Sequence, residues 1–289
     1  MMGRIYARPV AFAMLMSAVM LSIKFAIIAG FLAMTIAQAD EPKTLQTVVA
    51  SENIAVQKVE STPDRPRPVE EPRRTYFERI VASPMSHLGA SWLVRPERQA
   101  EENAEKALSQ LSLVDGMDVC DLGCGNGYWT LPMARAVGQA GQVYAVDIQP
   151  EMLRQLRTRA GKSNLENVVP VLGALDDPKL PENIKLDLLL MVDVYHEFSH
   201  PESMLWSIRN SLAPEGVVAL LEYREEDPNV PIKPLHKMSK HQILREYKAN
   251  GFKLVREFND LPWQHLMFFA RDDSPLPEIE AMPFVAVPN

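Results

Sequence analysis

Short apolar runs alternate with amphipathic stretches from residue 76 to residue 273, and this alternation sets the predicted fold. Runs rich in Val, Leu and Ile predict strands, and stretches with apolar residues three or four positions apart predict helices. The predicted strands are residues 118–122, 142–146, 168–172, 186–192, 217–222, 253–258 and 266–270. The predicted helices are residues 96–111, 129–137, 150–160, 201–212 and 240–250.

The order of these elements predicts an α/β fold. Strands that alternate with helices form a parallel sheet with helices on both faces. Only a short segment separates the last two predicted strands, so they are expected to pair antiparallel as a hairpin. The predicted fold class is therefore three-layer and doubly wound, with a mainly parallel seven-stranded sheet and an antiparallel C-terminal hairpin strand.

The N-terminal segment has a different pattern. Residues 9–38 are almost wholly apolar, Arg4 and Arg8 precede them, and Ala-Gln-Ala ends at position 39 before Asp40. This end has the small-x-small form of a signal-peptidase site, and Met20 is an alternative start that would leave a signal peptide of ordinary length. The full run is also long enough for an uncleaved anchor. Residues 1–39 are therefore predicted to be a signal peptide or a membrane anchor, with the remainder exported to the periplasm or outside the cell, or anchored in a membrane.

Proline-rich segments flank the patterned region. Residues 40–75 are polar and rich in proline, which predicts a flexible or partly extended linker. Residues 274–289 form a similar Pro-rich tail. A single domain is therefore predicted over residues 76–273.

Charge and cysteine content exclude several classes of function. The 30 Lys and Arg residues against 37 Asp and Glu residues give a net charge of -7. Because an acidic chain lacks the positive surface that binds phosphate backbones, a nucleic-acid partner is not expected, and a small-molecule substrate fits better. Cys120 and Cys124 flank one strand end and are expected to be free thiols. With no Cys/His cluster in the sequence, no metal site is predicted.

A glycine-rich turn follows the first predicted strand, in the sequence Asp-Leu-Gly-Cys-Gly-Asn-Gly over residues 121–127. Such a turn between a strand and a helix exposes bare backbone to a ligand. A phosphate-binding P-loop would need Lys-Ser/Thr after the last glycine, where Tyr128 and Trp129 stand. A dinucleotide fingerprint would need a small residue at position 128, so a nicotinamide cofactor is disfavoured.

The turn resembles the Asp-Leu-Gly-x-Gly-x-Gly loop of the class I, seven-stranded S-adenosylmethionine-dependent methyltransferases, in their small-molecule branch. The resemblance covers about residues 96–271. It implies S-adenosylmethionine as cofactor, with Asp121 near its amino-acid end. Backbone access would come from Gly123, Gly125 and Gly127, with Cys124 and Asn126 in the same loop.

Two further strand ends carry candidate cofactor contacts. Asp147 ends the second predicted strand, where a carboxylate can accept hydrogen bonds from a ribose diol or can cap the helix that starts at Pro150. Ile148 follows as a wall residue. After the third strand, where the family often has an acidic residue for the adenine, Ala174 stands at the expected place. Asp176 either reaches inward or lies in a solvated turn.

Polar residues after the fourth predicted strand are candidates for acting on the acceptor. If a helical turn begins there, Asp193 and His196 share one face, and the pair can serve as general base. The alternative is that both only bond to the loop backbone. Segments 83–92, 222–240 and 261–265 are expected to form lids or walls of the site.

These features predict a methyltransferase that acts on a small or membrane-associated acceptor. The first alternative is a non-catalytic nucleoside-binding or scaffold protein on the same fold. The second, less favoured because of Tyr128, is an NAD-dependent oxidoreductase. Membrane association is expected only through the N-terminal segment.

Overall fold

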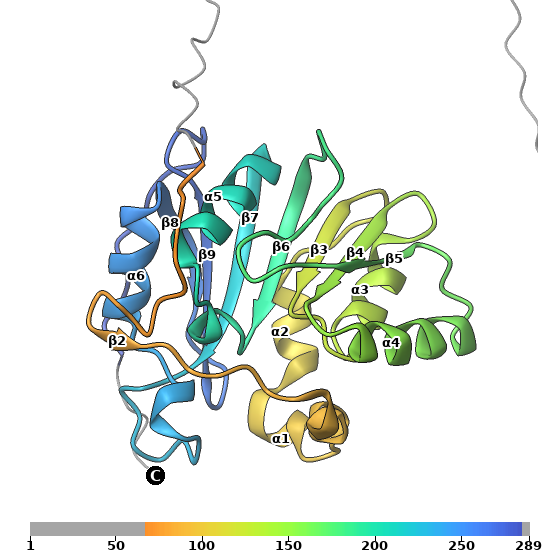
Figure 1. Ribbon diagram of the computed structural model, residues 1–289, viewed down its shortest axis with the longest axis horizontal. Coiled ribbons are helices and arrows are strands. Elements are labelled where there is room, and N and C mark those ends of the chain that lie inside the picture. Colours follow the sequence, from red (N-terminus) through yellow and green to blue (C-terminus); the bar gives the residue numbers. More distant parts are fainter. Residues whose placement is uncertain (1–66, 285–289) are drawn as a thin grey trace, which may run out of the picture. The chain divides into compact units, whose positions relative to one another are not determined.

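The computed structural model describes residues 67–284, and Figure 1 shows their arrangement. The predicted signal peptide or anchor lies outside the described residues, as does most of the predicted linker. None of the helices within residues 67–284 combines the length and the apolar character needed to cross a bilayer.

Seven strands form the main sheet, in the order β5-β4-β3-β6-β7-β9-β8. They are β3 (Asp118–Leu122), β4 (Gln142–Asp147), β5 (Val168–Leu172), β6 (Leu186–Val192), β7 (Leu212–Tyr223), β8 (Phe252–Phe258) and β9 (Gln264–Arg271). The first five are parallel to one another, and β9 runs antiparallel to both β7 and β8. The predicted fold class is confirmed, including the C-terminal hairpin.

Helices cover both faces of this sheet. They are α1 (Arg98–Glu102), α2 (Ala104–Gln110), α3 (Thr130–Val137), α4 (Pro150–Lys162), α5 (Pro201–Ser211) and α6 (Lys240–Ala249), with 3-10 turns η1 (His87–Val94), η2 (Tyr195–Glu197) and η3 (Pro234–His236). A short hairpin of β1 (Thr75–Tyr76) and β2 (Arg79–Ile80) precedes them.

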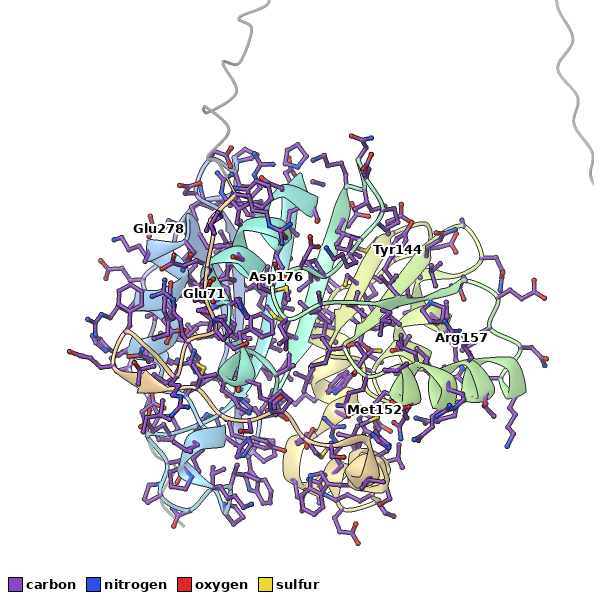
Figure 2. All side chains as sticks on the ribbon, viewed as in Figure 1. Glu71, Tyr144, Met152, Arg157, Asp176 and Glu278 are labelled. Atoms are coloured by element: carbon purple, nitrogen blue, oxygen red, sulfur yellow. The ribbon has the colours of Figure 1, made fainter. Side chains whose placement is uncertain are left out.

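Successive side chains along each strand point to opposite faces of the sheet and so pack against different helices. On β3, Cys120 packs in the cluster that includes α5 and α6, whereas Val119 packs in the cluster that includes α2 and α3. The helices are amphipathic, with an apolar side toward the sheet and a polar side toward solvent. In Figure 2, α4 carries Arg157 on its exposed side, and Met152 on the same helix is 1% exposed. The sheet is therefore buried on both sides, as expected for parallel strands.

The predicted helix 96–111 is interrupted at Asn103. This residue has φ of 51°, a left-handed conformation that Asn tolerates better than most residues, and its side chain accepts a hydrogen bond from the Lys106 amide. The chain therefore forms α1 and α2 as two separate helices. The apolar periodicity continues through both, which is why the sequence pattern does not reveal the break.

The last part of the predicted linker lies against the domain. Glu70 accepts a hydrogen bond from the Ser203 amide at 3.0 Å, in the first turn of α5. The residue that precedes α5, His200, makes no capping bond with its side chain. Glu70 therefore supplies, from outside the helix, the cap that α5 lacks.

We expect Glu70→Ala to lower the free energy of unfolding by about 1 kcal/mol, because it removes this cap. Urea denaturation measures the change. The neighbouring exposed Glu71 provides the matched control, and Glu71→Ala should leave stability unchanged. Equal stability of the two variants would show that Glu70 does not cap α5.

The described part of the Pro-rich tail runs along β8, the edge strand of the sheet. Ile279 donates its amide hydrogen to the Leu254 carbonyl at 2.8 Å. The ammonium of Lys240 pairs with Glu257 at 2.8 Å and donates a hydrogen bond to the Met282 carbonyl at 2.9 Å. The tail thus satisfies part of an edge that would otherwise be open to pairing with another chain.

Candidate functional site

A cavity of about 580 Å³ opens at the carboxyl ends of the central strands. Its wall includes Leu122 from β3, Val146 from β4 and Val192 from β6. The chain runs outward from β3 through β4 to β5 and then returns to β6 on the other side of β3. Such a reversal of strand order creates a crevice in doubly wound sheets.

The glycine-rich turn forms one side of this cavity. Gly123 has φ of 79°, Gly125 of 52° and Gly127 of 88°, which is backbone that glycine adopts without strain. Gly123 and Gly125 line the cavity. Gly127 does not, and a Cβ there would lie 2.3 Å from Cδ1 of Leu156 on α4. Two of the three glycines therefore give access to a ligand, and the third lets α4 pack closely.

Asp147 stands at the tip of β4, facing the cavity. Its Oδ2 accepts a hydrogen bond from the Gly125 amide at 2.9 Å, and its Oδ1 accepts one from the Gln149 amide at 2.8 Å. Burial raises the pKa of this carboxyl. Each oxygen keeps a second lone pair, so the carboxylate can also accept hydrogen bonds from a ligand. Ile148 lines the cavity beside it.

Asp121, Cys124 and Asn126 belong to the same strand end and turn, but their side chains are buried and are not among the cavity-lining residues. The Thr130 hydroxyl donates a hydrogen bond to Asp121 Oδ2 at 2.5 Å. Asn126 donates a hydrogen bond to the Ala90 carbonyl at 3.0 Å and so ties η1 to the turn. Cys124 is buried, and burial raises the pKa of its thiol; both cysteines are free, as expected.

Burial raises the pKa of Asp121 to about 6, although the Thr130 hydrogen bond acts to lower it. In the unfolded chain the same carboxyl loses its proton near pH 4. The contribution of this carboxyl to the free energy of unfolding is therefore fully present below about pH 4. It is lost as the pH rises through about 6, a change of roughly 3 kcal/mol.

The side chain in Asp121→Asn has the same shape but cannot ionise. We expect this variant to gain stability over wild type by that amount between about pH 4 and about pH 7, measured by urea denaturation. Parallel pH profiles of the two proteins would contradict the assignment.

Asp176 points away from the cavity. It pairs with Arg67 at 3.1 Å, and its side chain is 48% exposed. Ala174 and Leu175, which come just before it, line the cavity instead. Of the two positions considered for Asp176, the structure gives the one in a surface turn, where it helps hold the end of the linker.

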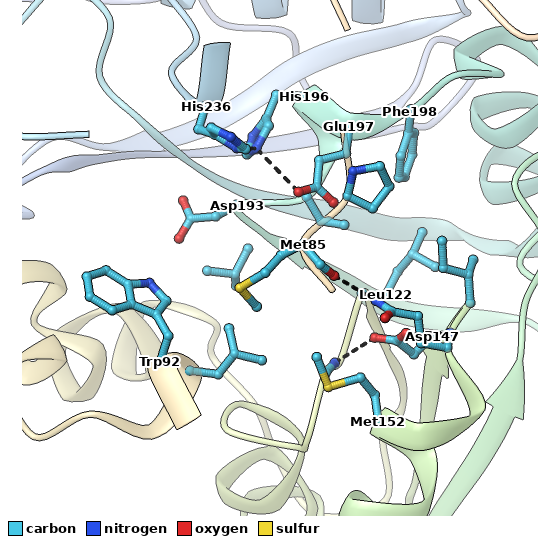
Figure 3. A pocket seen from close by; sticks show the side chains of 18 of the residues that line it. Met85, Trp92, Leu122, Asp147, Met152, Asp193, His196, Glu197, Phe198 and His236 are labelled. Carbon is cyan, nitrogen blue, oxygen red and sulfur yellow. Dashed lines mark hydrogen bonds and ion pairs between the residues drawn. The ribbon is translucent and has the colours of Figure 1, made fainter. Parts of the chain in front are cut away.

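The opposite end of the cavity contains the predicted acceptor residues, as Figure 3 shows. His196 is 1% exposed, and its Nδ1 lies 2.7 Å from Glu222 Oε2. Asp193 has φ of 53°, and both of its oxygens accept hydrogen bonds from Gln264 Nε2, at 2.8 and 2.9 Å. The expected Asp193–His196 pair is therefore corrected: Glu222 is the carboxylate partner of His196. The helical turn begins only at Tyr195, so the two side chains diverge.

Two neighbours of His196 complete this end. His236 Nδ1 lies 3.0 Å from His196 Nε2. Glu197 Oε1 lies 4.0 Å from the same nitrogen. Burial raises the pKa of Glu197 to about 7. Glu222, on the next strand of the sheet, raises the pKa of His196 against the opposing effect of burial.

The expected wall segments contribute unequally. Met85 and Trp92 from segment 83–92 line the cavity, as does His236 from segment 222–240. Segment 261–265 does not line it but supplies Gln264 to Asp193. Sequence patterns missed the buried ion pair of Arg98 and Glu102. Both residues line the cavity, and their side chains lie 2.6 Å apart.

Comparison with known proteins identifies the fold. A family model described as a methyltransferase domain matches residues 113–262, more than half of the 289-residue chain. The chain belongs to the methyltransferase domain family. The predicted relationship to class I S-adenosylmethionine-dependent methyltransferases is confirmed, and the fold and family of this methyltransferase domain imply S-adenosylmethionine as cofactor.

Individual relatives match only parts of the chain. Protein-L-isoaspartate O-methyltransferase of Methanococcoides burtonii is 29% identical over 112 residues, 38% of this chain and 51% of the relative. Nocamycin O-methyltransferase of Saccharothrix syringae is 39% identical over 74 residues, 25% of this chain and 26% of the relative. Over eight curated relatives, the chain spans from 14% to 56% of the relative's length.

A solved structure supports the fold of the methyltransferase domain. The crystal structure of a SAM-dependent methyltransferase from Aquifex aeolicus superimposes with a TM-score of 0.60 at 24% identity, covering 64% of this chain and 98% of that one. This likeness concerns the fold, because the identity is low.

Proposed function

We propose that this protein transfers the methyl group of S-adenosylmethionine to a small or membrane-associated acceptor. The observation that carries the proposal is the single cavity that joins the glycine turn and Asp147 to the polar cluster around His196. Its volume of about 580 Å³ lies within the range of about 300–1,000 Å³ that is usual for small-molecule sites. The name of one relative, nocamycin O-methyltransferase, is consistent with a small acceptor.

The cofactor end of the cavity, formed by the glycine-rich turn and Asp147, fits S-adenosylmethionine. When bound, this cofactor supplies an electrophilic methyl group on a sulfonium. Gly123 and Gly125 line the cavity and offer backbone groups to a ligand, and Asp147 offers lone pairs to ribose hydroxyls. Asp121 and Thr130 support the turn from below. We assign cofactor binding to this set.

The acceptor end of the cavity, around His196, is assigned to positioning and activation of the substrate. Glu222 fixes the orientation of the His196 ring through Nδ1, so that Nε2 faces the cavity. Trp92 and Met85 provide apolar wall on the other side of the cavity. We therefore propose that His196 acts on the acceptor, while the Asp193 carboxylate is held by the side chain of Gln264.

Two titrations and one turnover assay test the proposed function. Calorimetry should show binding of S-adenosylhomocysteine and no binding of NADH. Turnover against a panel of small acceptors should then show methyl transfer, which a nucleoside-binding scaffold would lack. The comparisons favour neither the scaffold nor the oxidoreductase. Tight binding of NADH alone would overturn the proposal.

His196→Ala is expected to reduce turnover at least about 100-fold, the usual contribution of a positioned proton acceptor, while the affinity for S-adenosylhomocysteine stays unchanged. The reason is that His196 lies at the acceptor end, away from the glycine turn. Wild-type turnover in this variant would remove His196 from the mechanism.

We also propose that residues 9–38 direct the domain to the periplasm or cell exterior, or anchor it in a membrane. The apolar run and the Ala-Gln-Ala sequence before Asp40 support this proposal. Mass spectrometry of the native protein after cell fractionation should find a new N-terminus at Asp40, or an intact N-terminus in the membrane fraction. An intact N-terminus in the soluble cytosolic fraction would contradict it.

A further inference from the structure

The acceptor end of the cavity brings together three side chains that carry metal-ligand atoms, His196, Glu197 and His236 (Figure 3). The ligand atoms of the three all lie within 4.8 Å of one another. Metal bonds to His and Glu are about 2.0–2.2 Å long, so two ligands of one ion lie at most about 4.4 Å apart, and a pair at the 4.8 Å limit would have to close by about 0.4 Å when an ion binds. We propose that these three residues bind one divalent transition-metal ion, with Zn²⁺ as the reference ion.

The tautomer of His196 fits a ligand. Its Nδ1 lies 2.7 Å from Glu222 Oε2, and a carboxylate oxygen can only accept, so Nδ1 carries a proton. In the neutral ring this leaves a bare lone pair on Nε2, which faces the cavity. A carboxylate behind one ring nitrogen is the usual support for a histidine that binds metal through the other. Glu222 is fully buried, so this support is held rigidly.

The spacing of the two imidazoles points in the same direction. His196 Nε2 and His236 Nδ1 lie 3.0 Å apart. Two nitrogen lone pairs at this separation need either a shared proton or a cation between them. Neighbouring ligands on one ion, each about 2.1 Å from it, are separated by about 3.0–3.4 Å, so the observed spacing already suits coordination. The ion would take the place of the proton.

The charges around the cluster also favour a cation. Glu197 and Glu222 both flank His196, and Asp193 lies close enough to Glu222 for their charges to repel. The buried cations nearby are paired with other carboxylates, Arg79 with Glu246 and Arg98 with Glu102. Lys233 also lines the cavity and acts on His236, but it is one positive charge against three carboxylates. A divalent ion would offset this excess of carboxylates.

Two histidines and one carboxylate are the ligand set of many catalytic zinc sites, which keep an open position for substrate. Here the open side faces the cavity, where an acceptor hydroxyl could coordinate. Its O–H bond would then break heterolytically, the proton leaving to a solvent water while the oxygen stays on the ion. With its Nε2 lone pair on the ion, His196 would not take the proton itself but would act on the acceptor through the ion. This role in activating the acceptor rests on the proposed function, whereas metal binding itself does not.

The test is metal binding by the full chain after treatment with a chelator and its removal. Calorimetric titration with Zn²⁺ and the visible absorption of added Co²⁺ should both show one ion per chain. We expect His236→Ala and Glu197→Gln to weaken binding at least tenfold, and Glu222→Gln to weaken it about 10–100-fold through loss of support for His196. His241→Ala, on the exposed side of α6, is the matched control and should bind as wild type does.

Circular dichroism and the affinity for S-adenosylhomocysteine, both measured on metal-free protein, show whether each variant is folded. Absence of stoichiometric binding in wild type would overturn the inference. Binding that is unchanged in folded His236→Ala and Glu197→Gln would overturn it too. Zn²⁺ binding without any binding of S-adenosylhomocysteine would leave the metal site standing and refute the proposed function instead.

Discussion

Gly125→Val is expected to lower the affinity for S-adenosylhomocysteine at least about 100-fold, equivalent to about 2.7 kcal/mol. A β-branched residue is strongly disfavoured at φ of 52°, and a Cβ here would lie 2.5 Å from Leu93 Cδ1. The turn must then change conformation. Because the Gly125 amide also donates a hydrogen bond to Asp147, both proposed cofactor contacts would be displaced together.

The control for this variant is Gly161→Val on α4. A Cβ at Gly161 meets no atom within 4 Å, so the same substitution there should leave affinity unchanged. Calorimetric titration of both proteins measures the difference. Wild-type affinity in a folded Gly125→Val protein would show that the turn does not hold the cofactor.

Glu246→Ala is expected to lower the free energy of unfolding by about 3–5 kcal/mol, the usual cost of breaking a buried ion pair. Glu246 is fully buried on α6 and accepts hydrogen bonds from Arg79 at 2.8 and 3.0 Å. It also accepts one from the Tyr195 hydroxyl at 2.8 Å. Without it, the guanidinium of Arg79 would stay buried and unpaired. The effect should extend to the site, because Arg79 also donates a hydrogen bond to the His196 carbonyl.

Urea denaturation measures this loss, and Glu78→Ala serves as its control. Glu78 pairs with Arg245 on the surface, with its side chain 87% exposed, so its removal should cost less than about 1 kcal/mol. Equal stabilities of the two variants would mean that the Arg79–Glu246 pair does not hold the N-terminal hairpin to α6.

Strands were predictable because their signal is local. The predicted bounds of β3, β5 and β6 agree with the structure residue for residue, since each is an apolar run flanked by polar or turn-forming residues. The break at Asn103 was not predictable from periodicity, because a single left-handed residue leaves the apolar spacing intact. The docking of Glu70 on α5 depends on a contact across 133 residues of sequence.

The cofactor end was predicted in outline. Asp147, Gly123 and Gly125 line the cavity, as expected of residues that directly follow or end parallel strands. Gly127 and Asp121 do not line the cavity and instead support the glycine-rich turn. Their positions follow from the packing of α4 and from the Thr130 hydroxyl, which are tertiary contacts that a motif does not contain.

The partner of His196 shows the limit of spacing arguments. Asp193 is three residues away in sequence, but Glu222 is 26 residues away and lies on the adjacent strand. The register of β6 with β7 pairs Val192 with Leu221, which brings Glu222 beside the residues that follow β6. Only knowledge of which strands are neighbours, and in which register, could have revealed this pair.

The central claim is that the bare backbone of the turn and the Asp147 carboxylate bind S-adenosylmethionine. A crystal structure of the protein grown with S-adenosylhomocysteine tests it most directly. We expect the ligand in the cavity, with its ribose hydroxyls bonded to Asp147 and its amino-acid end against Gly123 and Gly125. A cavity that stays empty at saturating ligand, or a ligand bound elsewhere on the molecule, would contradict the claim.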